Sequence, residues 1–286
     1  MIHSVFDLKG VPILCILFLV LFLFESRFPL RKRVQSRWKR ITINTIVSIP
    51  AFTLLRFLFL PLIVWLAYKN QTWHLGLNHI YSLPPVVEGA IAFILLDYTN
   101  YLWHVLNHKL PVLWRFHLVH HTDLDLDLTT AIRFHFGEII GSVFFRGACT
   151  VLTGISPVAV LIYEIVFEAA TQFHHSNWKL PFRIEQALNK VIVTPRMHGI
   201  HHSMIRNETD SNYSVIFSFW DRLHRTIRLN IHQHSLVTGV PAYSNPDELT
   251  VKHLLTMPFT RIRPWHTPND ERTTRESVPD KNELVE

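Results

Sequence analysis

Residues 116–121 read FHLVHH, and residues 197–202 read MHGIHH. The spacing His-x-x-His-His therefore occurs twice in one chain of 286 residues. In an α-helix, side chains three and four positions apart point from one face, whereas alternate residues of a β-strand point to opposite faces. Each triplet presents its three imidazoles together only if it is helical. The spacing thus predicts two short helices that hold clustered histidines.

The composition around these histidines is typical of a membrane protein. Hydrophobic residues make up 48% of the chain and charged residues 17%, whereas soluble domains carry about 25% charged residues. The net charge of +6 lies beside apolar segments, so we interpret it as a positive-inside signal and expect no nucleic acid partner. Cys15 and Cys149 both lie in apolar stretches, so neither a disulfide framework nor thiolate metal ligands are expected.

Hydropathy predicts an all-α integral membrane fold with four to five hydrophobic helices. The apolar segments are residues 11–24, 41–67, 86–106, 138–153 and 157–175. The first has 14 residues, fewer than the roughly 20 that a span needs. We interpret it as a retained anchor, because Glu25-Ser26-Arg27 is not a small-residue cleavage site. The last two segments are expected to form a hairpin bent at residues 154–157.

Positive charges in short loops set the expected orientation. Residues 26–40 contain seven Lys and Arg residues, whereas residues 68–85 contain one Lys. The 26–40 loop is therefore expected in the cytoplasm, and counting crossings places a cytoplasmic helical cap with all histidine motifs on the same side. We expect one membrane domain over residues 1–240. A polar, partly disordered tail is expected over residues 241–286, with disorder in its last ~20 residues.

Histidines gather in four places along the chain: His104 with His108, the two triplets, and His174 with His175. Neutral imidazole is a good ligand for iron, copper, zinc and nickel. Nine or ten imidazoles exceed the coordination shell of one metal and suit two. Because cysteines and nearby carboxylates are scarce, a structural zinc finger is not expected. One such histidine is more often an interfacial residue than a ligand, so the joint pattern carries the prediction.

Further motifs surround the histidines over residues 90–228. They are DYTNYLWHVLNH (97–108), WRFHLVHHTDLDLDLTTAIRFH (114–135), QFHHSN (172–177), VTPRMHGIHHS (193–203), ETDSNY (208–213) and FWDRLHRTIR (219–228), preceded by FPLRKR…RWKR…N ending at Asn44. With these motifs the chain resembles the fatty acid hydroxylase superfamily, of the kind often labelled sterol desaturase family. The resemblance implies a histidine-bound dinuclear metal site, usually taken as iron. It also implies O₂-dependent hydroxylation, desaturation or ether cleavage of lipids.

By position, the resemblance implies nine metal ligands. These are His104, His108, His117, His120, His121, His175, His198, His201 and His202. It implies two iron ions, which zinc can replace in purified or crystallised protein. His174 and His135 would be additional ligands or supporting residues. Thr171 stands where some hydroxylases have another histidine, which implies a smaller or more open ligand set.

Polar residues in apolar surroundings are interpreted as support for the ligands. Asp97 lies two helical turns before His104, with Tyr101 between them, and a carboxylate there can orient an imidazole. The alternative is an Asp97 that pairs with Asn100 or faces a water pocket. In the predicted hairpin, Arg146 and Glu164 lie at similar depth and are expected to form a structural ion pair.

Three other acidic or amide groups follow the triplets. Asp210 and Asn212 come soon after the last triplet and would orient His201 or His202, unless they only form an Asx turn. The three aspartates within residues 123–127 alternate with leucines. We interpret them as an exposed polar edge without a chemical role. The Trp-Asp pair at residues 220–221 either covers the site or only packs.

These features predict an O₂-dependent membrane lipid hydroxylase, of the monooxygenase type, or a desaturase. Its substrate would be a fatty-acyl, sterol or related lipid that enters from the bilayer. No haem-binding segment, dinucleotide fingerprint or iron–sulfur cysteine set is visible, so a separate cytochrome, ferredoxin or reductase is the expected electron donor. An alkylglycerol-type ether lipid monooxygenase is the alternative within the family.

Two readings from other classes are weaker. A histidine-rich metal transporter or sensor would hold its ligands along a path through the bilayer, whereas these histidines gather at helix ends on one side. A metal-stabilised scaffold without catalysis is the other. Because the chain ends in ELVE rather than an endoplasmic reticulum retention signal, a bacterial inner membrane is favoured over the endoplasmic reticulum. The oligomeric state is left open.

Overall fold

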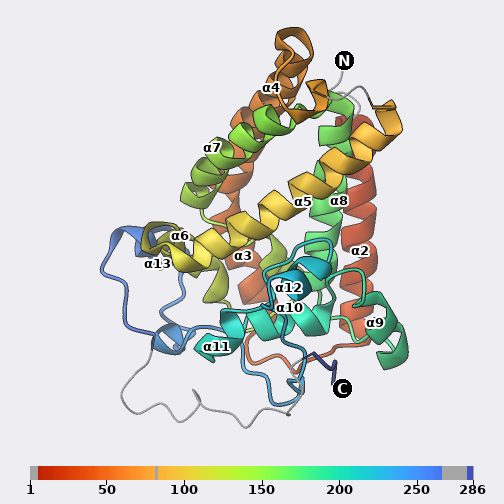
Figure 1. Ribbon diagram of the computed structural model, residues 1–286. Coiled ribbons are helices and arrows are strands. Elements are labelled where there is room, and N and C mark those ends of the chain that lie inside the picture. The colour runs from red at the N-terminus through yellow and green to blue at the C-terminus, as the bar shows by residue number, and fades with distance from the viewer. Residues whose placement is uncertain (1–5, 81–82, 266–281, 286) are drawn as a thin grey trace.

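The computed structural model describes residues 6–80, 83–265 and 282–285, and within them the chain is helical, with isolated β-bridges and no extended strand (Figure 1). The α-helices are α2 (Val11–Arg27), α3 (Arg37–Leu54), α4 (Leu60–Trp73), α5 (Pro85–Lys109), α6 (Pro111–His121), α7 (Phe136–Thr153), α8 (Pro157–His175), α9 (Phe182–Leu188), α10 (Pro195–His201), α11 (Arg206–Thr209), α12 (Phe219–Leu223) and α13 (Val251–Thr256). Shorter turns are η1 (Phe6–Gly10), η2 (Leu55–Phe59), η3 (Leu77–His79), η4 (Leu128–Ile132), η5 (Pro241–Tyr243) and η6 (Met257–Phe259). The predicted all-α fold is confirmed.

Three helical segments of the described chain are long and apolar enough to cross a membrane. They are Leu8–Arg27, Arg37–His79 and Phe136–Thr153. The first has 20 residues rather than the 14 of its apolar run, which is the length that a span needs. Helices α5 and α8, also expected as spans, are not among the three, since acidic residues dilute their apolar character. Figure 1 shows the long helices above a layer of short ones, α9 to α12.

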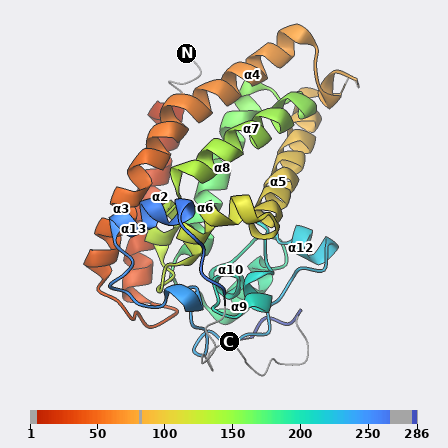
Figure 2. The same cartoon turned by 90° about the vertical axis from the view of Figure 1, so that its left-hand side faces the viewer.

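Residues 37–73 form one continuous helix with an irregular turn in the middle (Figure 2). Leu55–Phe59 is a π-turn in which the N–H of Leu60 donates to the carbonyl of Leu55, five residues back. Pro61 has no N–H, and its ring crowds the carbonyl four residues before it. A π-turn at this place gives that carbonyl room. The apolar segment predicted over residues 41–67 is therefore one bent helix.

The bend predicted at residues 154–157 separates α7 from α8. Gly154 has a φ of +71° and ends α7 in the left-handed region, which glycine adopts without steric cost. Pro157 then begins α8. Gly76 packs directly on this turn, because a Cβ added to it would lie 2.3 Å from the nitrogen of Gly154. The loop after α4 thus closes over the end of the hairpin.

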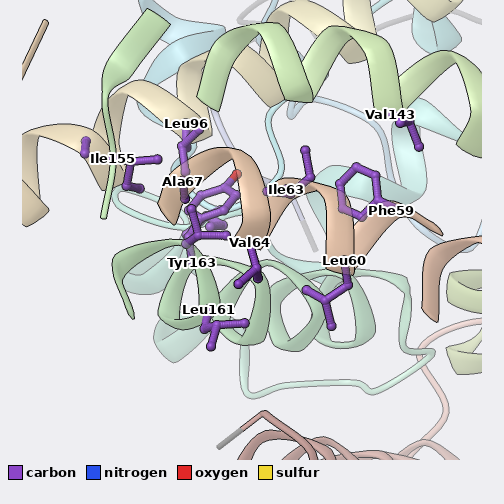
Figure 3. Packing of buried hydrophobic residues seen from close by; sticks show 13 residues of the cluster. Phe59, Leu60, Ile63, Val64, Ala67, Leu96, Val143, Ile155, Leu161 and Tyr163 are labelled. Carbon is purple, nitrogen blue, oxygen red and sulfur yellow. The ribbon is translucent and has the colours of Figure 1, made fainter. Parts of the chain in front are cut away.

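Helices α4, α5, α7 and α8 enclose the main apolar core. Its buried residues include Phe59, Leu60, Ile63, Val64, Ala67, Leu96, Val143, Ile155, Leu161 and Tyr163 (Figure 3). The Tyr163 hydroxyl accepts a hydrogen bond from Asn100 of α5. Asn100 is thus tied to α8 and does not pair with Asp97. The core holds the ends of α5 and α8 next to each other.

The predicted ion pair between α7 and α8 is confirmed. Arg146 donates to Glu164, and both side chains are largely buried. The guanidinium also lies 4.7 Å from the ring centroid of Phe59 and 4.9 Å from that of Phe167. Such contacts partly replace the water that a buried cation loses. The charge is therefore accommodated as a structural element of the hairpin.

The aspartates of residues 123–127 are buried, so their interpretation as an exposed polar edge is wrong. Arg40 of α3 donates from Nε and Nη2 to the carboxylate of Asp123, over 2.8 and 2.7 Å, and from Nη1 to Asp127 over 2.5 Å. Asn44 also donates to Asp123. Asp125 accepts two backbone N–H groups from the segment before α3. This Arg40 network fastens α3 to the loop that follows α6.

Glu25 at the end of α2 is a second buried acid that joins distant segments. Its Oε2 accepts N–H groups of Leu128 and Asn177, over 3.0 and 2.9 Å. Its Oε1 accepts from Arg37 over 2.7 Å. The sequence pattern did not single out this residue. Several of the positive charges counted in the 26–40 loop are thus neutralised inside the protein.

Part of the predicted polar tail packs against the body. Tyr243, Leu254 and Met257 are buried in one cluster with Leu118 and Val119 of α6. Most of the last ~20 residues, for which composition predicts disorder, lie outside the described residues. Among residues 282–285, Leu284 is buried in a small cluster near α10.

Removal of the Arg40 guanidinium should destabilise the fold strongly. Arg40→Ala removes the nearest counter-charge of two buried carboxylates and leaves only Arg133 and Arg33, each 3.8 Å away; breaking a buried pair typically costs about 3–5 kcal/mol. We expect a large drop in the thermal unfolding midpoint of the detergent-solubilised protein. Lys39→Ala is the matched control, because Lys39 pairs with Asp247 at the exposed surface and such pairs contribute about 0–1 kcal/mol. Equal midpoints for the two variants would contradict this role.

The same network predicts an acid transition. Burial alone would raise the pKa of the Asp123 carboxyl, but Arg40 and Arg133 outweigh it and lower this pKa from 3.8 to about 2. The resulting stability is present above pH 3.8 and is lost as the pH falls through about 2. The unfolding midpoint of the wild type should fall over this window, and that of Asp123→Asn should fall less. Asp247→Asn should behave like the wild type.

Candidate metal centre

The nine histidines predicted as ligands lie in two groups, and within each group one nitrogen per imidazole lies within 4.8 Å of the others. The first group contains His104, His108, His117, His121 and His201. The second group contains His120, His175, His198 and His202. All nine side chains are buried. The two groups are able to bind metal ions.

Both triplets are helical, as predicted, and each serves both groups. The first triplet ends α6 and the second ends α10. A helix turns about 100° per residue, so position i+4 lies about 40° to one side of position i, and i+3 about 60° to the other. His117 and His121 accordingly face the first group, and His120 faces the second. In the second triplet the roles are exchanged, because His201 alone joins the first group.

The other three histidines come from the ends of two long helices. His104 and His108 lie one turn apart at the end of α5, and His175 is the last residue of α8. Hydrophobic packing of α5 against α8 therefore places these rings beside α6 and α10. The centre combines the C-terminal ends of four helices, α5, α6, α8 and α10.

Distances between ring nitrogens fit metal binding. In the second group, the Nε2 atoms of His120, His175, His198 and His202 form a chain with separations of 3.1, 3.0 and 3.1 Å. In the first group, the Nε2 atoms of His117 and His121 are 3.1 Å apart. A neutral imidazole carries only one N–H. Two nitrogens bound at right angles to one ion, each about 2.1 Å from it, would be about 3.0 Å apart.

Hydrogen bonds from the opposite ring nitrogen direct these lone pairs inward. His104 Nδ1 lies 2.8 Å from the carbonyl of Tyr213, and His201 Nδ1 lies 2.7 Å from that of Ser211. Each carbonyl can only accept, so the proton belongs on Nδ1 and the lone pair on Nε2. Both Nε2 atoms are buried and, within the part of the chain that the structure describes, have no hydrogen-bond partner. A bound cation would satisfy them.

A carboxylate orients one further imidazole of the first group, and a second carboxylate lies near another. His117 Nδ1 lies 3.0 Å from Oε1 of Glu138, in the first turn of α7. His108 Nδ1 lies 3.5 Å from Oδ1 of Asp210. Asp210 thus faces His108 rather than the last triplet, which corrects its predicted partner. Sequence reasoning missed Glu138; its only signal was an acidic residue at the start of an apolar helix.

Asp97 supports the centre indirectly, which corrects its predicted contact with His104. Its carboxylate accepts from the N–H groups of Ile216 and Phe217, over 3.3 and 3.1 Å, and from Nε1 of Trp220 over 2.8 Å. The carboxylate of Asp221 accepts from the N–H groups of residues 213 and 214, over 2.9 Å each. Burial raises the pKa of this carboxyl group. Two carboxylates thereby hold the segment whose carbonyls face the imidazoles.

Asn212 and Tyr101 also act through this segment. Asn212 has a φ of +54°, and its amide donates to the carbonyls of Met197 and Arg228 over 2.9 and 2.7 Å. The Tyr101 hydroxyl lies 3.1 Å from that of Thr226. Neither residue contacts an imidazole of the last triplet through these bonds. Asn212 thus holds the backbone, whereas Tyr101 contacts the Thr226 hydroxyl, which in turn donates to Asp221.

The two additional histidines lie outside both groups. His174 lies beside the second one, with its ring centroid 4.1 Å from that of His198 and its Nδ1 3.2 Å from the carbonyl of Val215. His135 is the N-cap of α7, where its Nδ1 accepts from the N–H of Gly137 over 3.0 Å. His135 is thus engaged in helix capping.

Electrostatics keep most of the clustered imidazoles neutral. Burial, reinforced by the neighbouring histidines, lowers the pKa of His120, His121, His198 and His202 well below the ordinary value. Burial lowers the pKa of His201 to about 3. Neutral imidazole is the form that binds metal ions, since its lone pair is free. The groups are therefore ready to bind metal at neutral pH.

Comparison with known proteins agrees with this geometry. Residues 89–226 match the model of the fatty acid hydroxylase family. Rat (Rattus norvegicus) cholesterol 25-hydroxylase is 24% identical over 57% of this chain and 54% of its own length. Alkylglycerol monooxygenase of Danio rerio is 32% identical over 48% of this chain and 29% of its own length. Ornithine lipid hydroxylase OlsE of Rhizobium tropici is 28% identical over 49% and 41%.

The chain thus spans about half, or less, of the length of these relatives. No solved structure matches it significantly. The matched region contains all nine clustered histidines and the segment that orients them, and the resemblance inferred from the motifs is confirmed. Over residues 89–226, the chain is similar to the fatty acid hydroxylase family.

Proposed function

We propose that this protein is a membrane lipid hydroxylase with two iron ions, one in each histidine group. The convergence of nine buried imidazoles into groups of five and four carries the proposal. The relatives named above are, by name, a cholesterol hydroxylase, an alkylglycerol monooxygenase and an ornithine lipid hydroxylase, which supports a lipid substrate. Metal transport is less compatible with nine ligands gathered at one place.

The proposed reaction is balanced by O₂ and an external electron donor. A lipid C–H bond, O₂, two electrons and two protons would give a lipid C–OH group and water. A pair of iron ions, when bound, supplies the redox chemistry that activates O₂ toward an unactivated C–H bond. Two electrons must come from a separate cytochrome, ferredoxin or reductase, in line with the motifs missing from the sequence.

The protein's own contribution is ligand positioning and exclusion of water. The hydrogen bonds at Nδ1 of His104, His117 and His201 hold each ring in one orientation. A cavity of about 70 Å³ beside both groups is walled by Trp103, Phe134 and other side chains. Phe134 stacks on His120, with ring centroids 4.7 Å apart. This apolar wall would separate the reacting carbon from bulk water.

The position in the membrane is part of the proposal. The three candidate spans support an integral membrane protein. The charges of residues 26–40, at the histidine end of the helices, place the centre on the cytoplasmic side by the positive-inside pattern. Arg37 and Arg40 are neutralised by Glu25 and by the aspartates, so the remaining positive charges carry this inference. A bacterial inner membrane is the favoured location.

Lipid analysis under ¹⁸O₂ tests the proposed activity. Cells with a competent electron donor that express the wild type should gain a lipid with one ¹⁸O atom. His120→Ala and His201→Ala remove one ligand from each group and should abolish this product, because the ligand sets become incomplete. His234→Ala is the matched control, since His234 is exposed and lies outside both groups.

Other products would redefine the reaction. A lipid that loses two hydrogens without gaining ¹⁸O would indicate a desaturase, and loss of an ether bond would indicate the alkylglycerol-type reaction. No change in any lipid between the wild type and the ligand variants would contradict the proposed enzyme.

A further inference from the structure

A second cavity adjoins the histidine groups on the membrane side. It has a volume of about 100 Å³ and lies between α3, α5, α7 and α8. It shares Trp103, Phe134 and Phe167 with the cavity that the histidines line. The two spaces are therefore neighbours, and the polar residues Asn100 and Glu138 line both of them as well.

This cavity faces the bilayer. Its wall includes Phe52, which is 42% exposed and belongs to the candidate span Arg37–His79. Pockets that enclose a whole small ligand usually measure about 300–1,000 Å³. A cavity of about 100 Å³ would hold only part of a lipid. The rest of the lipid would lie between the helices or in the bilayer.

The polar groups in the apolar wall are not equivalent. Arg146 is bound to Glu164, Asn100 to the hydroxyl of Tyr163, and the Ser142 hydroxyl to a backbone carbonyl. Glu168 also lines the cavity, but within the described residues its carboxyl forms neither a hydrogen bond nor an ion pair within 4.0 Å. Besides the Arg146–Glu164 pair, the wall thus holds the carboxyl groups of Glu168 and of Glu138, whose Oε1 lies 3.0 Å from Nδ1 of His117.

A carboxyl group in such surroundings is costly and is usually kept for a function. A purely structural role would be that of a second partner for Arg146. That role is already filled by Glu164 and by the two aromatic rings that enclose the guanidinium. Glu168 is therefore the carboxyl group on this wall that neither an imidazole nor a guanidinium binds, and it is available to a ligand.

We propose that Glu168 anchors the polar end of the lipid substrate by accepting a hydrogen bond from its hydroxyl or ammonium group. The proposal rests on the function proposed above and adds a substrate class to it: a lipid with a hydrogen-bond donor. Glu168 precedes His175 by seven residues on α8, a separation of about 10 Å along a helix. The oxidised carbon should thus lie roughly 10 Å from the donor group.

Binding can be measured without turnover. The full-length protein in lipid nanodiscs, without O₂, would be titrated with a brominated long-chain alcohol, the matching amine and the matching alkane. Bromine quenches tryptophan fluorescence on contact, and Trp103 lines the cavity. Trp103→Phe identifies the part of the signal that comes from this residue. Because the three probes differ only at the polar end, their affinities report on the anchor.

We expect the alcohol or the amine to bind roughly tenfold or more tightly than the alkane, as for a hydrogen bond to a charged group. Glu168→Leu should abolish this preference. Glu168→Gln, which is nearly isosteric, should keep the preference for a hydroxyl and lose that for an ammonium group. Glu88→Leu is the matched control, since this acid lies at the far end of α5 outside the cavity.

Equal binding of all three probes to the wild type would overturn the proposal. So would a donor preference that persists unchanged in Glu168→Leu or, for an amine, in Glu168→Gln. The outcome is independent of the ¹⁸O₂ experiment, because binding needs no catalysis. Donor preference without an oxidised lipid would refute the proposed function alone. An oxidised lipid without donor preference would refute only the role of Glu168.

Discussion

In each His-x-x-His-His triplet, the first and last imidazoles point in nearly the same direction from the helix, and the middle imidazole points in another. This rotation lets one short helix serve two groups, and two such helices, α6 and α10, exchange their roles. Other helices bring the ring nitrogens of further histidines to the same place. Helices α5 and α8 supply three histidines because their apolar packing ends beside α6 and α10.

Burial alone would leave nine imidazoles free to choose tautomers and orientations. The segment 211–215 limits this choice, because its alternate carbonyls face His201, His104 and His174. Asp97 and Asp221 hold the N–H groups of the same segment or of the residues directly after it. The carboxylates thus hold the backbone, and the backbone carbonyls in turn orient the imidazoles. Metal ligands are commonly oriented by such outer hydrogen bonds.

Sequence patterns were sufficient for the helical triplets and the Arg146–Glu164 pair, because each follows from spacing along one or two helices, and the resemblance to a known family added the set of nine clustered histidines. They failed where a partner lies far away in the chain. The aspartates of residues 123–127 alternate like an exposed edge, yet Arg40 and Asn44, more than 75 residues earlier, bury them. The basic motif ending at Asn44 was the only signal. Asp97 was recognised as functional, but its partners lie 119 or more residues later.

The central claim is that the two groups hold two neighbouring iron ions. Metal analysis and Mössbauer spectroscopy of the ⁵⁷Fe-loaded protein test it most directly, with His108→Ala for the first group, His175→Ala for the second and His234→Ala as control. The wild type and the control should hold two iron ions per chain. Their Mössbauer spectra should show two iron sites of equal intensity that are magnetically coupled to each other. Each ligand variant should lose one site and the coupling. One iron per chain, or two uncoupled irons unaffected by these substitutions, would contradict the account.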